Sequence, residues 1–255
     1  MSIFKLPNNF CDELRSLVLQ FWWRSNGGKR RISWIAWKKL CAPKCLGVLG
    51  FQDYRNFNLA LLGKQAWRLV TDPSSLMAKV LGGKYFHGKS FMSSELGPNP
   101  SYTWRSIWEA KQVLGLGLRR RVGDGLSTYI WKDPWIPGTQ TKRVISPRGD
   151  HDEDILVAEL LSVDGRSWNS QKACAFFLPF EQERIMNIRW SRSNSCDIWC
   201  WDTEKDGNYS FRSAYKLLMN EFEGNAGQSN FQREKQLWNS IWKMSIWPRI
   251  KVFFW

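Results

Sequence analysis

The chain has 255 residues, with 37 Lys or Arg against 23 Asp or Glu and a formal net charge of +14. Its hydrophobic content of 43% excludes a disordered tail, and no run of about 20 apolar residues is present to span a membrane as a helix. Residues 1–125 hold 20 basic and 7 acidic residues, whereas residues 126–255 hold 17 and 16. This asymmetry predicts that the front half meets a polyanion; the alternative is a basic surface with no specific partner.

The front half carries the signals of successive helices. Apolar residues recur at helical spacing from Phe10 to Trp22, with Asn9 as the expected cap. Further helices are predicted from Ser33 to Pro43, after Asn56 up to Asp72-Pro73, from a Ser74 cap to Gly82-Gly83, and over residues 101–115. In the helix with the Ser74 cap, the apolar residues are Leu76, Met77, Val80 and Leu81.

The pattern changes after residue 115. Residues 118–122 and 126–131 flank Gly123-Asp124-Gly125, and residues 197–201 and 208–211 flank a second turn at 205–207; both pairs are typical of β-hairpins. Short helices are predicted over 154–161, 180–186, 212–222 and 234–244. The expected fold is mainly α with two small β-hairpins: a helical N-terminal half and an irregular α+β C-terminal half.

Signals for catalysis or metal binding are weak. His87 and His151 have no nucleophile in a recognisable arrangement, and the acidic cluster at 152–154 can simply complement a helix dipole. The pairs Cys41/Cys45 and Cys196/Cys200 have spacings seen in zinc sites, but residues 196 and 200 on a strand would lie about 13 Å apart. We therefore expect ordinary thiols, no metal, no cofactor and no catalytic residues.

Basic clusters are the strongest binding signal. Cations neutralise phosphates and aromatic rings stack on bases, although the helical spacing of the tryptophans indicates that most of them are core. Lys38 and Lys39 lie off the tryptophan stripe and are expected to face outward. The predicted phosphate contacts are Arg24, Lys29, Arg30, Arg31, Lys38, Lys39, Arg119, Arg120 and Arg121.

Three stretches resemble the segment downstream of the polymerase domain in plant non-LTR (LINE-type) retrotransposon reverse transcriptases. They are KRRISWIAWKKLCAPKCLGVLGFQDYRNFNLALLGKQAWRLV, PSYTWRSIWEAKQVLGLGLRRRVGDGLSTYIWKDPWIPG, and the pair DGNYSFRSAYKLL and LWNSIWKMSIWPRIKVFFW. The last pair is similar to the start of the zinc-binding region of these enzymes. The resemblance implies a basic thumb- or connection-like region over 1–115, a hairpin and linker over 116–150, and a truncated zinc-binding-like region over 151–255.

The resemblance also implies what the chain lacks. The family's polymerase carries an aromatic-x-Asp-Asp motif for two metal ions, and this sequence contains no Asp-Asp pair; the family's zinc ligands follow the stretch that matches here. We therefore expect a non-catalytic fragment that binds RNA or DNA backbone without sequence preference and does not bind a membrane. Its expected location is the nucleus or, alternatively, the mitochondrion. The alternatives are a transposon relic without function, and a protein–protein module that self-associates through the apolar residues 246–255.

Overall fold

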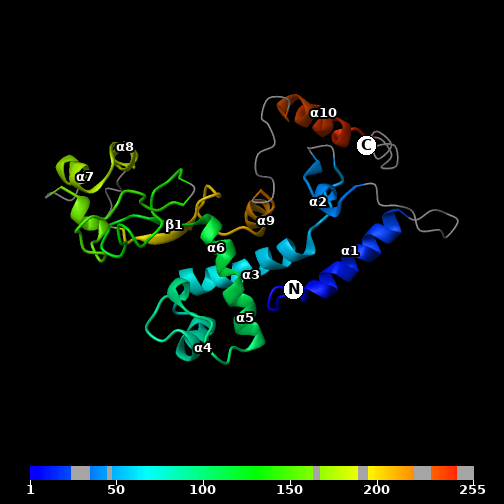
Figure 1. The fold of residues 1–255 in the computed structure, drawn as a ribbon, viewed down its shortest axis with the longest axis horizontal. Coiled ribbons are helices and arrows are strands. Elements are labelled where there is room, and N and C mark those ends of the chain that lie inside the picture. The colour runs from blue at the N-terminus through cyan, green and yellow to red at the C-terminus, as the bar shows by residue number, and fades with distance from the viewer. Residues whose placement is uncertain are drawn as a thin grey trace. The chain divides into compact units, whose positions relative to one another are not determined.

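The computed structural model describes residues 1–23, 35–44, 48–139, 141–162, 167–188, 195–220 and 231–245. Contacts divide the chain into two compact units: unit 1 comprises Met1–Leu62 and Tyr215–Trp255, and unit 2 comprises Gly63–Ala214. Helices dominate the described residues, and the strands they contain form one small antiparallel sheet, so the predicted mainly α class is confirmed (Figure 1). The division implied by the resemblance stays a prediction.

Unit 1 is built from helices at both ends of the chain. Its elements are α1 (Asn8–Trp22), α2 (Trp37–Leu40), the first turns of α3 (Tyr54–Thr71), the later turns of α9 (Phe211–Asn220) and α10 (Phe231–Lys243). Buried Asn58 on α3 ties down the N-terminal segment, because its side chain accepts from Leu6 N and donates to the carbonyls of Met1 and Phe4. Both N–H donors and the oxygen of this amide are thereby used inside unit 1.

Helix α3 begins earlier than the sequence indicated. The carboxylate of Asp53 accepts a hydrogen bond from Asn56 N at 2.9 Å and so caps the helix, while Asp53 N donates to the Tyr215 hydroxyl at 2.9 Å. Asn56, which was predicted to precede the helix, instead lies buried within its first turn. The hydrogen bond to Tyr215, which lies 162 residues further along the chain, holds Asp53 at this position.

Unit 2 contains the remaining elements. They are the rest of α3, α4 (Leu76–Tyr85), η2 (Phe91–Ser93), α5 (Tyr102–Glu109), α6 (Lys111–Gly117), β1 (Leu118–Arg121), η3 (Val157–Leu160), α7 (Ser170–Phe176), α8 (Pro179–Met186), β2 (Ile198–Trp201) and the start of α9. The predicted helix over 101–115 is thus two helices, α5 and α6, joined at Ala110. Its expected core side chains, Trp104 and Ile107, are buried.

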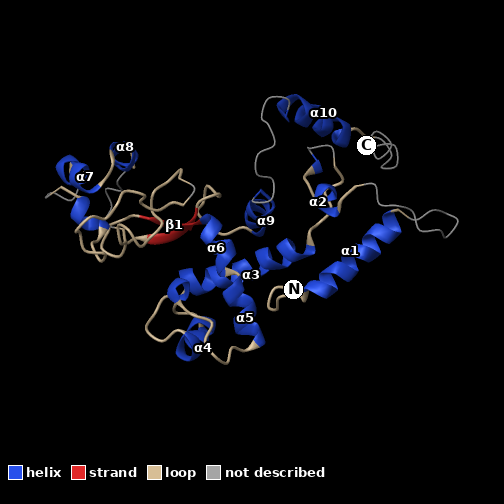
Figure 2. Ribbon diagram, in the orientation of Figure 1, coloured by secondary structure: helices blue, strands red, loops and turns tan. Residues whose placement is uncertain are grey.

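The strand pairing differs from both predicted hairpins. β1 pairs with β2, in the antiparallel register Leu118↔Trp201 to Arg121↔Ile198, so partners lie some 80 residues apart in the chain (Figure 2). Residues 126–131 form turns and an isolated bridge from Tyr129 to Leu156 instead of returning along β1. A turn does follow β2, because Trp201 N donates to Gly207 O at 2.7 Å, but residues 208–210 lead directly into α9. The two hairpin predictions are therefore wrong, although 118–121 and 198–201 are strands.

Helix α4 also differs from its prediction. Ser75, and not Ser74, is the cap, since its hydroxyl accepts from Ala78 N, and the helix continues through Gly82-Gly83 to Tyr85. Ala78 is the buried residue of the helix, whereas Leu76 is 78% exposed and Val80 is 61% exposed. Met77 and Leu81 are partly buried, so the helix turns only some of its apolar residues inward.

A hydrophobic core of unit 2 lies among residues 130–136, η3, α7 and α8. It contains two tryptophans whose indole N–H groups are satisfied by the backbone: Trp135 donates to Ile130 O and Trp168 donates to Ile188 O, both at 2.9 Å. The buried members are Ile130, Trp135, Ile136, Val157, Leu160, Trp168, Ala173, Phe177 and Ile185. Trp135, which lies in one of the stretches that resemble the reverse transcriptases, thus packs as core.

Candidate nucleic-acid interface

The cations predicted on α2 are exposed as expected. Helix α2 buries Leu40 completely, and the side chains of Lys38 and Lys39 lie on its solvent side. Arg24, Lys29, Arg30 and Arg31 lie outside the described residues. Their role as phosphate contacts stays a prediction.

The three arginines of β1 do not form one surface. Successive side chains on a strand point to opposite faces, so Arg120 faces away from Arg119 and Arg121. Arg119 forms an ion pair with Asp202 at 2.6 Å, and its side chain is 19% exposed. The Arg120 guanidinium lies 4.6 Å from the centre of the Trp199 ring and donates to the Ser127 hydroxyl at 2.6 Å. Two of the three therefore make contacts inside unit 2, and Arg121 is the one placed on the surface.

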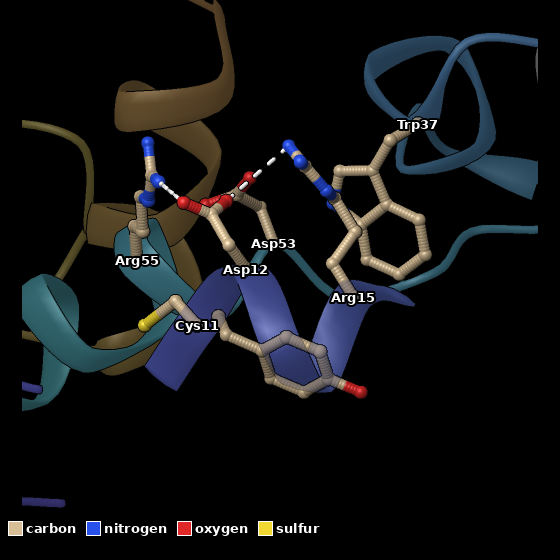
Figure 3. A pocket seen from close by; sticks show the side chains of 7 residues that line it. Cys11, Asp12, Arg15, Trp37, Asp53 and Arg55 are labelled. Atoms are coloured by element: carbon tan, nitrogen blue, oxygen red, sulfur yellow. Dashed lines mark hydrogen bonds and ion pairs between the residues drawn. The ribbon is translucent and has the colours of Figure 1, made fainter. Parts of the chain in front are cut away.

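Two arginines not singled out from the sequence line a small pocket in unit 1. Arg15 and Arg55 both contact the carboxylate of Asp12, at 3.4 and 2.6 Å, and remain nearly half exposed (Figure 3). Trp37 of α2 and Asp53 at the start of α3 complete a cavity of about 40 Å³, together with Cys11 and Tyr54. The pocket brings two cations and an aromatic ring together on α1, α2 and α3, an arrangement that only folding creates.

Thiol chemistry is disfavoured at Cys11, which lines this pocket, and at Cys41, which lies elsewhere in unit 1. Burial raises the pKa of the Cys11 thiol and raises the pKa of Cys41 to about 12. The thiolate is the form that attacks substrates and binds metals, and at neutral pH these two groups stay protonated. Within the described ranges, no three His, Cys, Asp or Glu side chains cluster as metal ligands would.

The net charge is concentrated in unit 1. By sequence, unit 1 holds 16 Lys or Arg and 6 Asp or Glu, whereas the longer unit 2 holds 21 and 17. Within unit 2, the cations gather in residues 63–112, with seven Lys or Arg against three Asp or Glu, and residues 113–214 are balanced at 14 and 14. The basic character of the front half therefore becomes a strongly basic unit 1 and a smaller basic segment in unit 2.

Sequence reasoning missed a buried carboxylate that organises the loop after β1. Asp197, 7% exposed, accepts hydrogen bonds from the backbone N–H groups of Gly123, Gly125 and Ser127 at 2.6 to 3.0 Å. The hydroxyls of Ser127 and Thr128 add two more, at 3.2 and 2.7 Å. The loop thus forms an anion-binding nest, and the anion is the chain's own carboxylate.

The charge state of Asp197 follows from these bonds. Burial by itself favours the protonated acid, but the hydrogen bonds from Thr128, Gly123, Gly125 and Ser127 outweigh burial and lower the pKa of Asp197. The Gly-Asp-Gly sequence signals a loop rich in free N–H groups, but nothing local indicates that the acceptor lies about 70 residues further along the chain.

Glu181 on α8 plays a similar part. Its side chain is fully buried and accepts from Ile145 N and Ser146 N, both at 2.8 Å, and from the Ser146 hydroxyl. The same hydroxyl accepts from Leu178 N. Glu181 therefore connects α8 to the loop at 145–146.

Among the described residues, no helix combines the length and the apolar character needed to cross a bilayer.

Comparison with known proteins identifies plant relatives. The Arabidopsis thaliana "Uncharacterized mitochondrial protein AtMg00310" is 45% identical over 137 residues, which are 53% of this chain and 89% of that protein. The Arabidopsis thaliana "Putative ribonuclease H protein At1g65750" is 30% identical over an alignment of 259 residues, covering 100% of this chain and 41% of that protein. This chain thus spans about two fifths of the length of the second relative. No family model and no solved structure matches the chain. Since this chain covers nearly all of the first relative at high identity, it belongs to the same family as that plant mitochondrial protein.

Proposed function

We propose that this chain is a nucleic-acid-binding segment of a plant retroelement-derived reverse transcriptase. It holds sugar–phosphate backbone without reading sequence and performs no polymerisation itself. The observation that carries the proposal is the charge of unit 1, which contains 16 basic residues and 6 acidic residues. A charge excess of this kind supplies non-specific affinity for nucleic acid.

The relatives support a nucleic-acid partner. A ribonuclease H acts on RNA paired with DNA, and the relative with that word in its name is similar along this entire chain. The sequence motifs that resemble plant LINE-type reverse transcriptases support the same kind of partner. A nuclear location fits such an element, and the mitochondrial name of the other relative makes the mitochondrion the alternative.

Exposed cations on α2 are the best-defined contacts of this proposal. Leu40 anchors the short helix in the core of unit 1, so that Lys38 and Lys39 are held at the surface. Phosphate contacts of this kind fix the position of a duplex and carry no sequence information. Arg15 and Arg55 can add to them, because both remain nearly half exposed beside Asp12.

The double substitution Lys38→Ala and Lys39→Ala is expected to weaken binding to a mixed-sequence RNA–DNA duplex by roughly ten- to sixty-fold at about 0.1 M salt. Each phosphate that a cation neutralises releases counterions and contributes about 0.9 to the slope of log K against log salt. The slope should therefore become less steep by about 1.8, which fluorescence anisotropy over a salt series measures.

A matched control removes two exposed cations from the balanced part of unit 2. Arg143→Ala with Lys205→Ala lowers the net charge by the same amount, and it should leave the slope within about 0.5 of the unchanged chain. Equal effects of the two double variants would mean that only the overall charge matters. A salt-independent affinity of the unchanged chain would reject backbone binding altogether.

The absence of polymerase activity is tested separately. The purified chain with a primed RNA template, deoxynucleotides and Mg²⁺ should give no primer extension, since two-metal catalysis needs convergent carboxylates. Incorporation above that of a heat-denatured sample would contradict the non-catalytic part of the proposal and leave the binding part standing.

A further inference from the structure

The outer face of α4 has the pattern of a helix-docking surface. Leu76, Val80 and Gly83 follow one another at spacings of four and three residues, the repeat that aligns a seam along one side of a helix. Leu76 and Val80 are 78% and 61% exposed, while the opposite side of the helix buries Ala78. The seam therefore faces away from the core of unit 2.

Lysines flank this seam on both sides. Lys79 directly precedes Val80 and Lys84 directly follows Gly83, and both side chains are exposed. At 100° per residue, these two positions lie on opposite edges of the apolar seam. In paired helices, the residues at such edge positions select the partner through opposite charge. A seam with a lysine on each edge selects a helix with acidic edges.

The surroundings strengthen this selection. Residues 63–112 hold seven Lys or Arg against three Asp or Glu, so an approaching basic helix would be repelled before contact. Gly83 places no side chain in the seam, and a Cβ added at this position would meet nothing within 4 Å. A partner side chain can therefore approach the α4 backbone closely at that point.

We propose that the outer face of α4 docks an acidic amphipathic helix of a partner protein. The partner's apolar stripe would cover Leu76 and Val80, and its carboxylates would pair with Lys79 and Lys84. A nucleic-acid duplex fits the lysines but not the centre of the face, because two exposed aliphatic side chains would meet sugars and phosphates instead of an apolar stripe. This surface lies on different residues from the α2 cations and does not depend on the function proposed above.

The test uses a pair of synthetic helical peptides of about 21 residues. Both carry Leu at the two seam positions of each heptad; one has Glu at every edge position and the other has Lys. Like charges on the edges disfavour pairing of each peptide with itself. Fluorescence anisotropy with the full chain should show that the Glu peptide binds at least about tenfold more tightly than the Lys peptide.

Two double variants locate the site. Lys79→Glu with Lys84→Glu should reverse the preference, so that the Lys peptide becomes the tighter ligand. Leu76→Ser with Val80→Ser should weaken binding of the Glu peptide by at least about tenfold. Because both side chains are exposed, the thermal unfolding midpoint should stay within about 2 °C of that of the unchanged chain. Lys38→Ala with Lys39→Ala, in unit 1, should leave peptide binding unchanged.

Three results would overturn the proposal. The first is that the two peptides bind equally well, or that neither peptide binds. The second is a Glu-peptide affinity that the α4 charge reversal leaves intact. The third is a loss of RNA–DNA duplex affinity in Leu76→Ser with Val80→Ser without any peptide binding, which would assign this face to nucleic acid. Because the α2 variants report on duplex binding and the α4 variants on peptide binding, failure of one proposal is distinguished from failure of the other.

Discussion

Replacing Asp197 by Asn is expected to lower the free energy of unfolding by about 3–5 kcal/mol, since it disrupts a buried, fully hydrogen-bonded charge. The two carboxylate oxygens accept five hydrogen bonds from Gly123, Gly125, Ser127 and Thr128. An amide keeps one of these oxygens and turns an NH₂ group, itself a donor, toward the remaining donors. Urea unfolding followed by far-UV circular dichroism measures the loss.

The pH dependence gives this prediction a second readout. The folded-state pKa of Asp197 is lowered, so the stability it contributes is fully present above its unfolded value of about 3.9 and is lost as the pH falls through the folded value. The stability difference between the unchanged chain and Asp197→Asn should therefore be constant from about pH 5 to 7 and should narrow below about pH 4.

Asp206 supplies a matched control. Its carboxylate also accepts a backbone N–H, that of Asn208 at 3.0 Å, but the side chain is exposed. Asp206→Asn should cost less than about 1 kcal/mol. If Asp197→Asn were no more destabilising than Asp206→Asn, the loop at 123–128 would not depend on the buried carboxylate.

Gly117→Ala is expected to destabilise the chain by about 2–3 kcal/mol, because the added methyl group has no room. A Cβ at this position would lie 2.5 to 2.7 Å from three ring atoms of Trp201. The ring is fully buried, its N–H donates to the Ser213 hydroxyl at 2.8 Å, and it packs against Tyr209 with ring centres 4.7 Å apart. It cannot move aside without losing those contacts, so the chemical-denaturation midpoint should fall.

Gly115 lies in the same helix, and its replacement by alanine is expected to have the opposite effect on stability. It is exposed, and a Cβ there would meet nothing within 4 Å. Gly115→Ala should therefore stabilise the chain by about 0.5–1 kcal/mol, since alanine loses less backbone entropy in a helix. Equal midpoints for the two alanine variants would contradict the close packing of α6 on Trp201.

Sequence patterns sufficed where the structure depends on neighbours within one or two helical turns. The spacing of Trp104 and Ile107 predicted the buried face of α5, and the run 180–186 is helix α8 to within a residue. The exposure of Lys38 and Lys39 followed from their place off the tryptophan stripe. In each case the deciding interactions are local, so periodicity carries the information.

The sequence by itself determined the helical class, the basic front half and the tryptophan-rich core. Only the tertiary structure decided that Leu118–Arg121 pairs with Ile198–Trp201, that Asp197 fills the Gly123–Thr128 loop, and that α4 turns Leu76 outward. The physical reason is the distance along the chain over which the deciding interactions act. Propensity and periodicity act over a few residues, whereas strand pairing, burial of a carboxylate and the choice of a helix face are set by contacts between segments far apart in the chain.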